Sequence, residues 1–220
     1  MNNLSLRKAL PLVVALVASV IPAFADSYYD RRVSLFDSLP VGDHDIVFLG
    51  NSLTDGGEFA ELFDMPNVLN RGISSDVIEG VAARTEQVTK GRPAKIFLLI
   101  GINDVSHHLT VDQLASRYRN LVMKIRRESP RTELYIQSVM PIDNSFGRYK
   151  NLKGKEQVIL DLNRRLKAIA AESGAGYIDL WPALADPRGR LRKGFTNDGL
   201  HLTGAGYDAW RDAVARWVRQ

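Results

Sequence analysis

The sequence predicts an α/β fold, a three-layer α/β/α sandwich in which a five-stranded parallel sheet lies between two layers of helices. Short apolar runs alternate with amphipathic segments along the 220 residues, which is the order that βαβ connections produce. The run from Ala94 to Gly101 is apolar almost throughout, as expected of a strand that helices cover on both faces. No Pro-, Gly- or Ser-rich linker interrupts residues 26–220, so we expect one domain there.

The five expected strands are short apolar runs that end at turn residues. They cover residues 45–50, 67–70, 94–101, 132–140 and 177–180. In an open parallel sheet, ligands bind beyond the carboxyl ends of the strands. Function is therefore expected in the loops that follow Gly50, Asn70, Ile100, Met140 and Leu180.

The expected helices carry apolar residues at helical spacing. The continuous helices among them cover residues 76–90, 111–128 and 156–172. A last helix is expected after Thr203, whose hydroxyl can cap the free N–H groups of the first turn. Its residues Trp210, Val214 and Val218 fall on one face, which predicts that this face is buried.

The first 25 residues have the pattern of a secretory signal peptide. Arg7 and Lys8 precede an apolar run that ends in Ala23-Phe24-Ala25, a small-x-small cleavage site. An uncleaved anchor is the alternative, because the run approaches the length of a short membrane span. Two prolines in the run and the polar residues after Ala25 favour cleavage. We therefore expect an exported protein, periplasmic or secreted, whose mature chain is residues 26–220 with no stable membrane insertion.

The composition excludes several classes of function. The chain has no Cys, which excludes a disulfide scaffold, a thiolate zinc site and a Cys nucleophile. Without residues 1–25 it has 27 basic and 25 acidic side chains, and its basic clusters lack a recognition motif, so no nucleic-acid partner is expected. The basic segment 188–193 is interpreted as a solvated turn, with binding of an anionic substrate as the alternative.

Ser52 is the first candidate for chemistry, because it lies two residues beyond the first strand. From position alone, a serine before a helix is more often a cap than a nucleophile. The spacing of Gly50, Gly56 and Gly57 fits neither a dinucleotide-binding nor a phosphate-binding loop, so no cofactor is expected. A nucleophile elbow would need Gly where Thr54 stands. Ser52 would therefore require a base from elsewhere in the chain.

Four histidines limit the search for that base. His44 precedes the first strand, whereas His107 and His201 follow strands and lie at the expected active edge. Asp198 stands three residues before His201, a spacing that lets its carboxylate hold one ring nitrogen while the other faces a serine. Asp104 and His107 have the same spacing, so spacing alone does not choose between the two pairs.

Four separated segments resemble the conserved blocks of the SGNH or GDSL hydrolase superfamily. They are Gly50-Asn51-Ser52-Leu53, Asn70-Arg71-Gly72-Ile73, Gly101-Ile102-Asn103-Asp104 and Asp198-Gly199-Leu200-His201. The resemblance implies the flavodoxin-like SGNH hydrolase fold. It also implies that Ser52 is the nucleophile and that Asp198 and His201 are the catalytic acid and base. The backbone N–H of Gly72 and the side-chain amide of Asn103 would complete the oxyanion hole.

The resemblance is greatest to platelet-activating-factor acetylhydrolase-like and bacterial carbohydrate-esterase-like members. It implies a serine esterase that acts on small O-acyl esters, with O-acetyl esters as the first candidates and no metal or cofactor. A lysophospholipase or thioesterase for longer chains is the alternative, followed by a binding module that has lost catalysis. The active-edge loops are short, and Phe146 and Tyr149 of the longest could wall only a shallow pocket, which predicts preference for short acyl groups.

Overall fold

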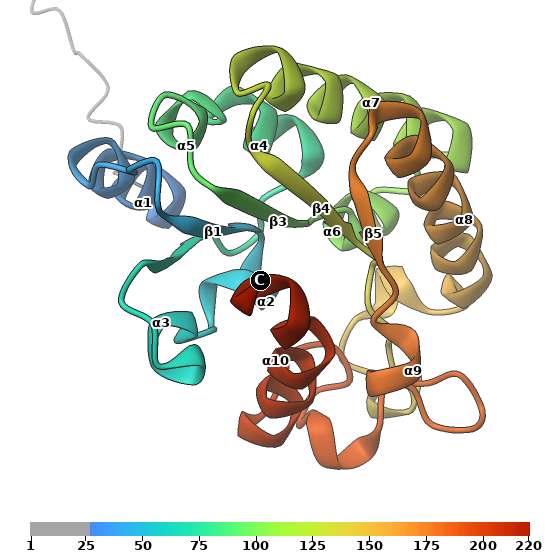
Figure 1. Cartoon of the computed structure of the whole chain (residues 1–220). Helices are drawn as coiled ribbons and strands as arrows, with labels where there is room; N and C mark the ends of the chain where they lie inside the picture. Colours follow the sequence, from blue (N-terminus) through green and yellow to red (C-terminus); the bar gives the residue numbers. More distant parts are fainter. Residues whose placement is uncertain (1–26) are drawn as a thin grey trace, which may run out of the picture.

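The fold is known from a computed structural model that describes residues 27–220; the predicted signal peptide, residues 1–25, lies outside the described residues. A five-stranded parallel sheet has the strand order β2-β1-β3-β4-β5 (Figure 1). The strands are β1 (Ile46–Gly50), β2 (Val68–Gly72), β3 (Lys95–Leu99), β4 (Glu133–Gln137) and β5 (Gly176–Ile178). This is the flavodoxin-like doubly wound order, and the predicted fold class is confirmed.

Helices of very different lengths connect the strands. They are α1 (Tyr28–Ser38), α2 (Ser52–Asp55), α3 (Phe59–Phe63), α4 (Ile78–Ala83), α5 (Glu86–Thr89), α6 (Ile102–Ser106), α7 (Val111–Glu128), α8 (Glu156–Ser173), α9 (Trp181–Leu184) and α10 (Gly204–Arg219). Three 3₁₀ turns complete the set: η1 (Asn144–Phe146), η2 (Lys150–Leu152) and η3 (Lys193–Phe195). In the part of the chain from residue 27 onward, none of these helices is long and apolar enough to span a bilayer.

The two faces of the sheet bury separate apolar cores. One core lies beneath α4, α5, α7 and α8, and the other beneath α3, α9 and α10 (Figure 1). In the second core the ring of Phe48 stacks on Phe59 at 4.0 Å and on Phe97 at 4.9 Å. Trp210 of α10 meets Phe59 edge-on at 5.2 Å and donates its indole N–H to Gln137. This aromatic packing fixes α10, and with it the loop that precedes α10, against the sheet.

Two predictions about helices need correction. The helix expected over residues 76–90 is divided into α4 and α5, because Arg84 leaves helical geometry at φ −114°, ψ 13° and its side chain turns under the sheet edge. Thr203 does precede α10 in an extended conformation, as predicted. Its hydroxyl, however, donates to the carbonyl of Gly194 at 3.1 Å and caps no N–H of the helix.

Candidate active site

A cavity of about 530 Å³ opens at the carboxyl edge of the sheet. Every strand is followed by a segment that contributes to its walls. The contributing side chains include Ser52 after β1, Ser75 after β2, Asn103 after β3, Tyr149 after β4 and His201 after β5. A second cavity of about 710 Å³ lies between α1 and α5, and none of the predicted site residues lines it. The candidate active site is therefore the smaller of these two cavities.

Ser52 is the first residue of α2, and the neighbouring Asn51 takes the capping position. The side-chain oxygen of Asn51 accepts the N–H of Leu53 at 3.1 Å. The hydroxyl of Ser52 is thus not needed as a cap, and its backbone N–H has no partner among the described residues. A serine at a helix N-terminus with a free N–H can both attack a carbonyl and stabilise the oxygen that becomes negative.

His201 and Asp198 stand in one tight turn before α10. The Nε2 of His201 lies 3.0 Å from the Oγ of Ser52, and its Nδ1 lies 2.8 Å from Oδ2 of Asp198. The other oxygen of Asp198 accepts the backbone N–H groups of Leu200 and His201 at 2.9 and 2.8 Å. The turn passes through Gly199 at φ +89°, a conformation that favours glycine. Both carboxylate oxygens of Asp198 are therefore fixed, and so is the imidazole plane.

Tyr149, which the sequence suggested only as a pocket wall, contacts this pair directly. Its hydroxyl donates to Oδ2 of Asp198 at 2.7 Å and lies 2.9 Å from Nδ1 of His201. Burial raises the pKa of Asp198, but hydrogen bonds from His201, Tyr149 and two backbone N–H groups outweigh burial and hold this pKa well below its usual range. Burial and the bond to Asp198 raise the pKa of Tyr149 to about 12, so its hydroxyl remains a donor.

Asn103 is placed on α6 with its amide in the cavity wall. Its Nδ2 donates to the carbonyl of Asp76 at 2.8 Å, which holds the amide while leaving its second N–H available. The chain reaches α6 through Gly101 at φ +124°. This arrangement suits the side-chain donor role that was predicted for Asn103.

Gly72 does not line the cavity, contrary to the prediction. Its N–H donates to the side-chain oxygen of Asn70 at 2.7 Å and is not available to an ester. A Cβ at Gly72 would lie 2.1 Å from the backbone nitrogen of Asp55, so this glycine allows β2 and α2 to pack closely. Ser75, three residues further on, does line the cavity, and its N–H has no partner in the described structure. It holds the left-handed conformation, at φ +68°.

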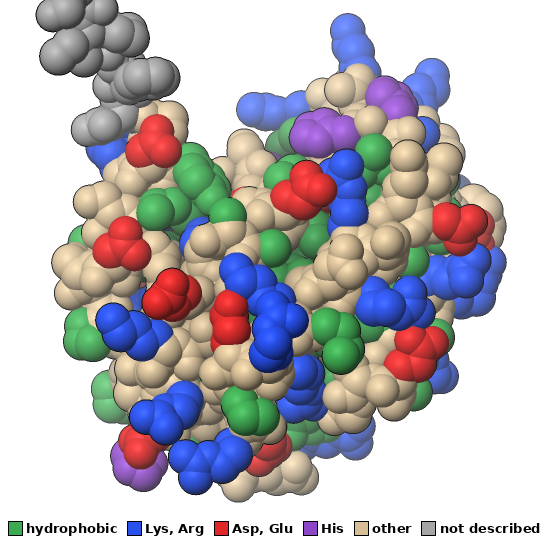
Figure 2. All heavy atoms as spheres, turned by 90° about the horizontal axis from the view of Figure 1, so that it is seen from above, with side chains coloured by type: hydrophobic (Ala, Val, Ile, Leu, Met, Phe, Trp, Pro, Cys, Tyr) green, Lys and Arg blue, Asp and Glu red, His purple; other side chains and the backbone are tan. Residues whose placement is uncertain are grey.

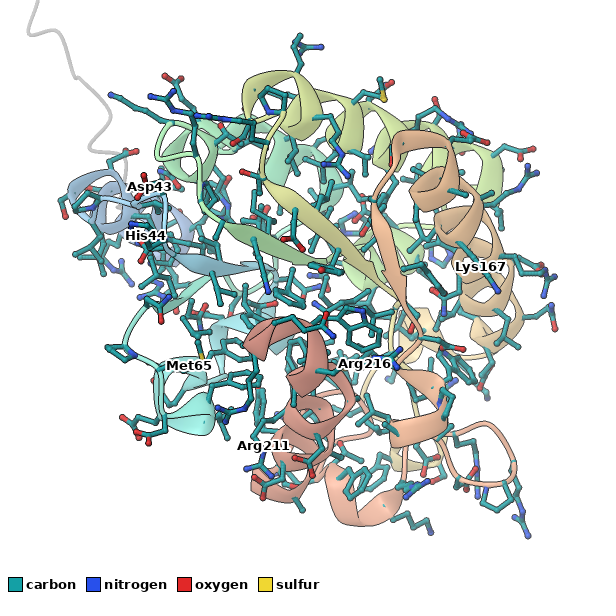
Figure 3. All side chains as sticks on the ribbon, viewed as in Figure 1. Asp43, His44, Met65, Lys167, Arg211 and Arg216 are labelled. Atoms are coloured by element: carbon teal, nitrogen blue, oxygen red, sulfur yellow. The ribbon has the colours of Figure 1, made fainter. Side chains whose placement is uncertain are left out.

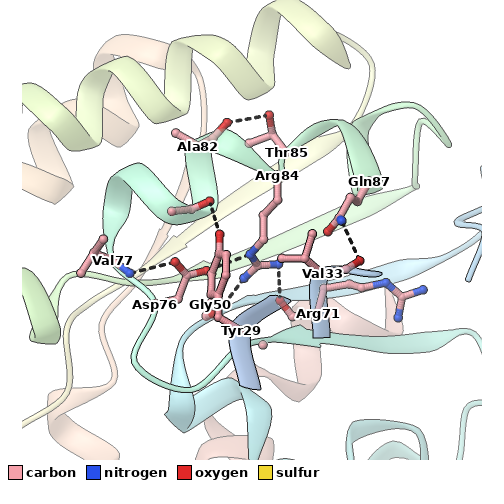
Figure 4. Close-up of polar contacts among 12 residues, drawn as sticks. Tyr29, Val33, Gly50, Arg71, Asp76, Val77, Ala82, Arg84, Thr85 and Gln87 are labelled. Carbon is pink, nitrogen blue, oxygen red and sulfur yellow. Dashed lines mark hydrogen bonds and ion pairs between the residues drawn. The ribbon is translucent and has the colours of Figure 1, made fainter. Parts of the chain in front are cut away.

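A buried ion pair between Arg84 and Asp76 stabilises the loops that follow β1 and β2 (Figure 4). The guanidinium of Arg84 contacts Asp76 at 2.8 Å and donates to the carbonyls of Arg71 and Gly50, each at 3.0 Å. The side chains of Arg84 and Asp76 are 2% and 1% exposed. Arg84 thereby joins the ends of β1 and β2 to the residue whose carbonyl holds Asn103. Removing either partner would leave a buried charge without its counterion.

The other histidines lie outside the cavity. His107 is exposed, and the carboxylate of Asp104 accepts the N–H of Ile78 at 3.1 Å. Burial raises the pKa of Asp104 to about 6, and the hydrogen bond from Ile78 opposes this shift. His44 projects beside Asp43 at the far periphery, with 95% of its side chain exposed (Figure 3). Between the two Asp–His pairs of equal spacing, only Asp198 and His201 approach a serine.

The basic segment 188–193 is likewise away from the cavity. Arg190 pairs with Asp186 at 3.2 Å, and Arg192 donates to the carbonyl of Ala185 at 2.9 Å. On the face seen in Figure 2, cationic and anionic side chains are interspersed. Across residues 27–220, no three His, Asp or Glu side chains converge as ligands for a metal ion.

Residues 48–209 match the GDSL-like Lipase/Acylhydrolase family. A GDSL-like lipase from Bacteroides thetaiotaomicron superposes with a TM-score of 0.75 at 23% identity, over 87% of this chain and 97% of that one. The acetylxylan esterase Axe2 from Geobacillus stearothermophilus gives 0.62 at 20% identity, over 81% and 95%. At such identities these two likenesses concern the fold alone.

A curated relative extends beyond the matched region. The N-acylneuraminate cytidylyltransferase of Escherichia coli O18:K1:H7 is 30% identical over 190 residues, which are 84% of this chain and 42% of that protein. The chain thus spans less than half the length of this relative, so the activity in the relative's name is not assigned to this chain. The family match covers most of the chain and agrees with the Ser–His–Asp geometry at the sheet edge. The chain belongs to the GDSL-like lipase/acylhydrolase family.

Proposed function

We propose that this protein is an exported serine esterase that cleaves small O-acyl esters, foremost O-acetyl esters, through Ser52, His201 and Asp198. The observation that carries the proposal is the continuous contact from Ser52 Oγ to His201 Nε2 at 3.0 Å and from His201 Nδ1 to Asp198 at 2.8 Å. A base within hydrogen-bond reach of a hydroxyl, held by a third group, is the arrangement that activates a serine.

In the proposed reaction, Ser52 Oγ attacks the ester carbonyl as His201 Nε2 takes its proton. The tetrahedral oxygen accepts hydrogen bonds from the N–H groups of Ser52 and Ser75 and from the amide of Asn103. His201 then gives the proton to the departing alcohol oxygen, which leaves an acyl-serine. His201 then deprotonates a water molecule that attacks the acyl-serine; as the acyl–Oγ bond breaks and the acid leaves, His201 returns the proton to Ser52 Oγ. Asp198 stays ionised and stabilises the imidazolium in both halves of the reaction.

The cavity wall favours a short acyl group. Leu152 and Leu200 are its aliphatic side chains, and its other walls are mostly hydroxyls, amides and cations. A long acyl chain would gain about 0.8 kcal/mol for each methylene it could bury, and this wall offers little apolar surface for that. These features weigh against the alternative of a lysophospholipase or long-chain thioesterase.

Export is part of the proposal and is supported by the pattern of residues 1–25. Residues 26–220 would then form the single catalytic domain. Sequencing the N-terminus of the protein recovered from outside the cytoplasm should give Asp26 first. An N-terminus upstream of the apolar run, on protein that sediments with membranes, would favour the uncleaved anchor.

The activity is tested by labelling and turnover together. A fluorophosphonate should label the wild-type protein, and Ser52→Ala should lose both the label and 4-nitrophenyl acetate hydrolysis while keeping its circular dichroism spectrum and Tm. His201→Ala should lose turnover comparably, whereas His107→Ala should retain it. A folded wild-type protein that neither reacts with the probe nor hydrolyses any ester would support the non-catalytic binding module instead.

A further inference from the structure

Two cations, on either side of Tyr149, line the cavity that holds Ser52, and neither has a part in the proposed reaction. Arg148 and Lys150 line the cavity together with Asn151 and Leu152, and both charged side chains are exposed. No Asp or Glu is among the residues that line it. The cavity that holds Ser52 is therefore positively charged at its entrance.

The segment that carries these cations is fixed against the catalytic turn. Tyr149 stands between Arg148 and Lys150, and its hydroxyl is bound to Asp198 at 2.7 Å. Upstream, the N–H of Asp143 donates to the carbonyl of Gly199 at 2.8 Å. Downstream, the side chain of Leu152 is buried. The backbone on either side of the two cations is anchored. The positions of their Cα atoms relative to the turn that carries His201 are therefore fixed, although their side chains are flexible.

In the part of the chain from residue 27 onward, this pair of cations has no carboxylate in contact with it. Neither Arg148 nor Lys150 forms an ion pair with a carboxylate of the described residues. Arg148 interacts with the hydroxyl of Tyr149, which is neutral, and opposes the rise in its pKa. The segment 188–193 differs, because its Arg190 is paired with Asp186. An uncompensated positive charge at the entrance of a pocket attracts an anion and raises its local concentration.

We propose that Arg148 and Lys150 form an anion subsite, and that the substrate is a short-chain acyl ester of an alcohol bearing a carboxylate or phosphate group. The inference rests on the proposed function, because an acetyl or propionyl group carries no charge and the anion must then belong to the alcohol. Arg offers a planar fork that pairs with two oxygens of a carboxylate or phosphate, and Lys adds a point charge.

The test compares three aryl acetates: 4-acetoxybenzoate, 4-acetoxyphenyl phosphate and the neutral 4-acetoxybenzamide. The quantity measured is the ratio of kcat/KM for each anionic ester to that for the neutral one. Arg148→Gln and Lys150→Gln should each lower this ratio about fivefold, and the double variant about 25-fold. Arg148→Lys should retain most of it. Raising NaCl to 0.5 M should lower the wild-type ratio, because salt screens exposed charges.

Lys153→Gln is the matched control, because Lys153 is an exposed cation of the same segment that does not line the cavity. Its ratio should equal that of the wild type. A larger effect on the benzoate identifies a carboxylate as the preferred anion, and a larger effect on the phosphate ester identifies a phosphate. Ratios that are the same in the wild type and the double variant, or that fall equally in Lys153→Gln, would overturn the subsite. Hydrolysis of 4-acetoxybenzamide that Ser52→Ala abolishes tests the proposed function separately.

Discussion

At the scale of single residues, hydrogen bonds around Asp198 determine how the proposed base is held. Five donors converge on this one carboxylate: the imidazole of His201, the hydroxyls of Tyr149 and Thr196, and the N–H groups of Leu200 and His201. They keep the carboxylate ionised and oriented, so it can support a positive charge on the imidazole at each proton transfer. Four of these donors come from residues 196–201, and Tyr149 is the one supplied by another segment.

Tyr149→Phe should lower kcat/KM about tenfold, because it removes a hydrogen bond to a charged group next to the base. It should also lower Tm at pH 7. Because the folded-state pKa of Asp198 lies below the unfolded value of about 3.9, this bond stabilises the fold above that pH and is lost as the pH falls. The Tm deficit should therefore shrink towards pH 3. Tyr135→Phe, which breaks a similar bond to Glu133 away from the cavity, should leave kcat/KM unchanged.

Asn103→Ala should lower kcat by about 10²–10³, the usual loss for one oxyanion donor, with a smaller change in KM. Asn151→Ala is a suitable control, because Asn151 is the other amide in the cavity wall and is given no part in the reaction. A loss of tenfold or less in Asn103→Ala, with Tm preserved, would reduce Asn103 to a structural role.

At the scale of elements, helix length decided what could be predicted. The long amphipathic helices α7 and α8 were predicted to within a residue, because an apolar stripe that repeats over five turns has no strand alternative. Helices α2, α6 and α9 have four or five residues and no periodicity to detect. The break between α4 and α5 follows from the buried contacts of Arg84, which depend on segments far away in the sequence.

Asp104, which joins α6 to the start of α4, should make stability depend on pH. Its pKa is about 6 in the folded protein and about 3.9 in the unfolded chain, so the folded state binds the proton more tightly. The free energy of unfolding should then fall as the pH rises from about 3 to about 7, by about 3 kcal/mol in total. Asp104→Asn removes this titration and keeps an acceptor for Ile78, so its stability relative to wild type should increase over that range.

Urea titrations at pH 4, 5, 6 and 7 measure this dependence. Asp43→Asn is the control, since its side chain is 78% exposed. Its stability should differ little from that of the wild type, because substitutions of exposed side chains usually change stability only slightly. A stability difference for Asp104→Asn that does not grow between pH 4 and 7 would contradict the assigned titration.

At the scale of the whole molecule, the shallow cavity predicts the range of acyl chains. We expect kcat/KM to be greatest for acetyl or propionyl esters and to decline by C8, because Leu152 and Leu200 offer little apolar surface. Aryl esters from C2 to C12, assayed below their micelle concentrations, give this profile. An optimum at C8 or longer would favour the lysophospholipase or thioesterase alternative.

The parallel sheet and its active edge could be predicted because parallel strands all end at the same edge of the sheet. Ser52, Asn103 and His201 line one cavity, and Asp198 contacts His201 without lining it. The interpretation of Gly72 was wrong because a free N–H depends on a neighbour, here the side chain of Asn70, that spacing does not reveal. The contact of Tyr149 with Asp198 could not be predicted, because the two residues are 49 positions apart and Tyr149 lies in a loop without periodicity.

The distance along the chain between Ser52 and His201 has a consequence for biosynthesis. A ribosome produces the N-terminal part of a domain first, so Ser52 emerges 149 residues before the base that would activate it. The turn that holds His201 is fixed by α10, which follows it, through Trp210 and through the bond of Tyr207 to Leu53. Under the proposed mechanism a nascent or partly translocated chain carries no competent serine. Hydrolysis then begins only when Gly204–Arg219 have been delivered, and the appearance of activity reports that α10 has docked.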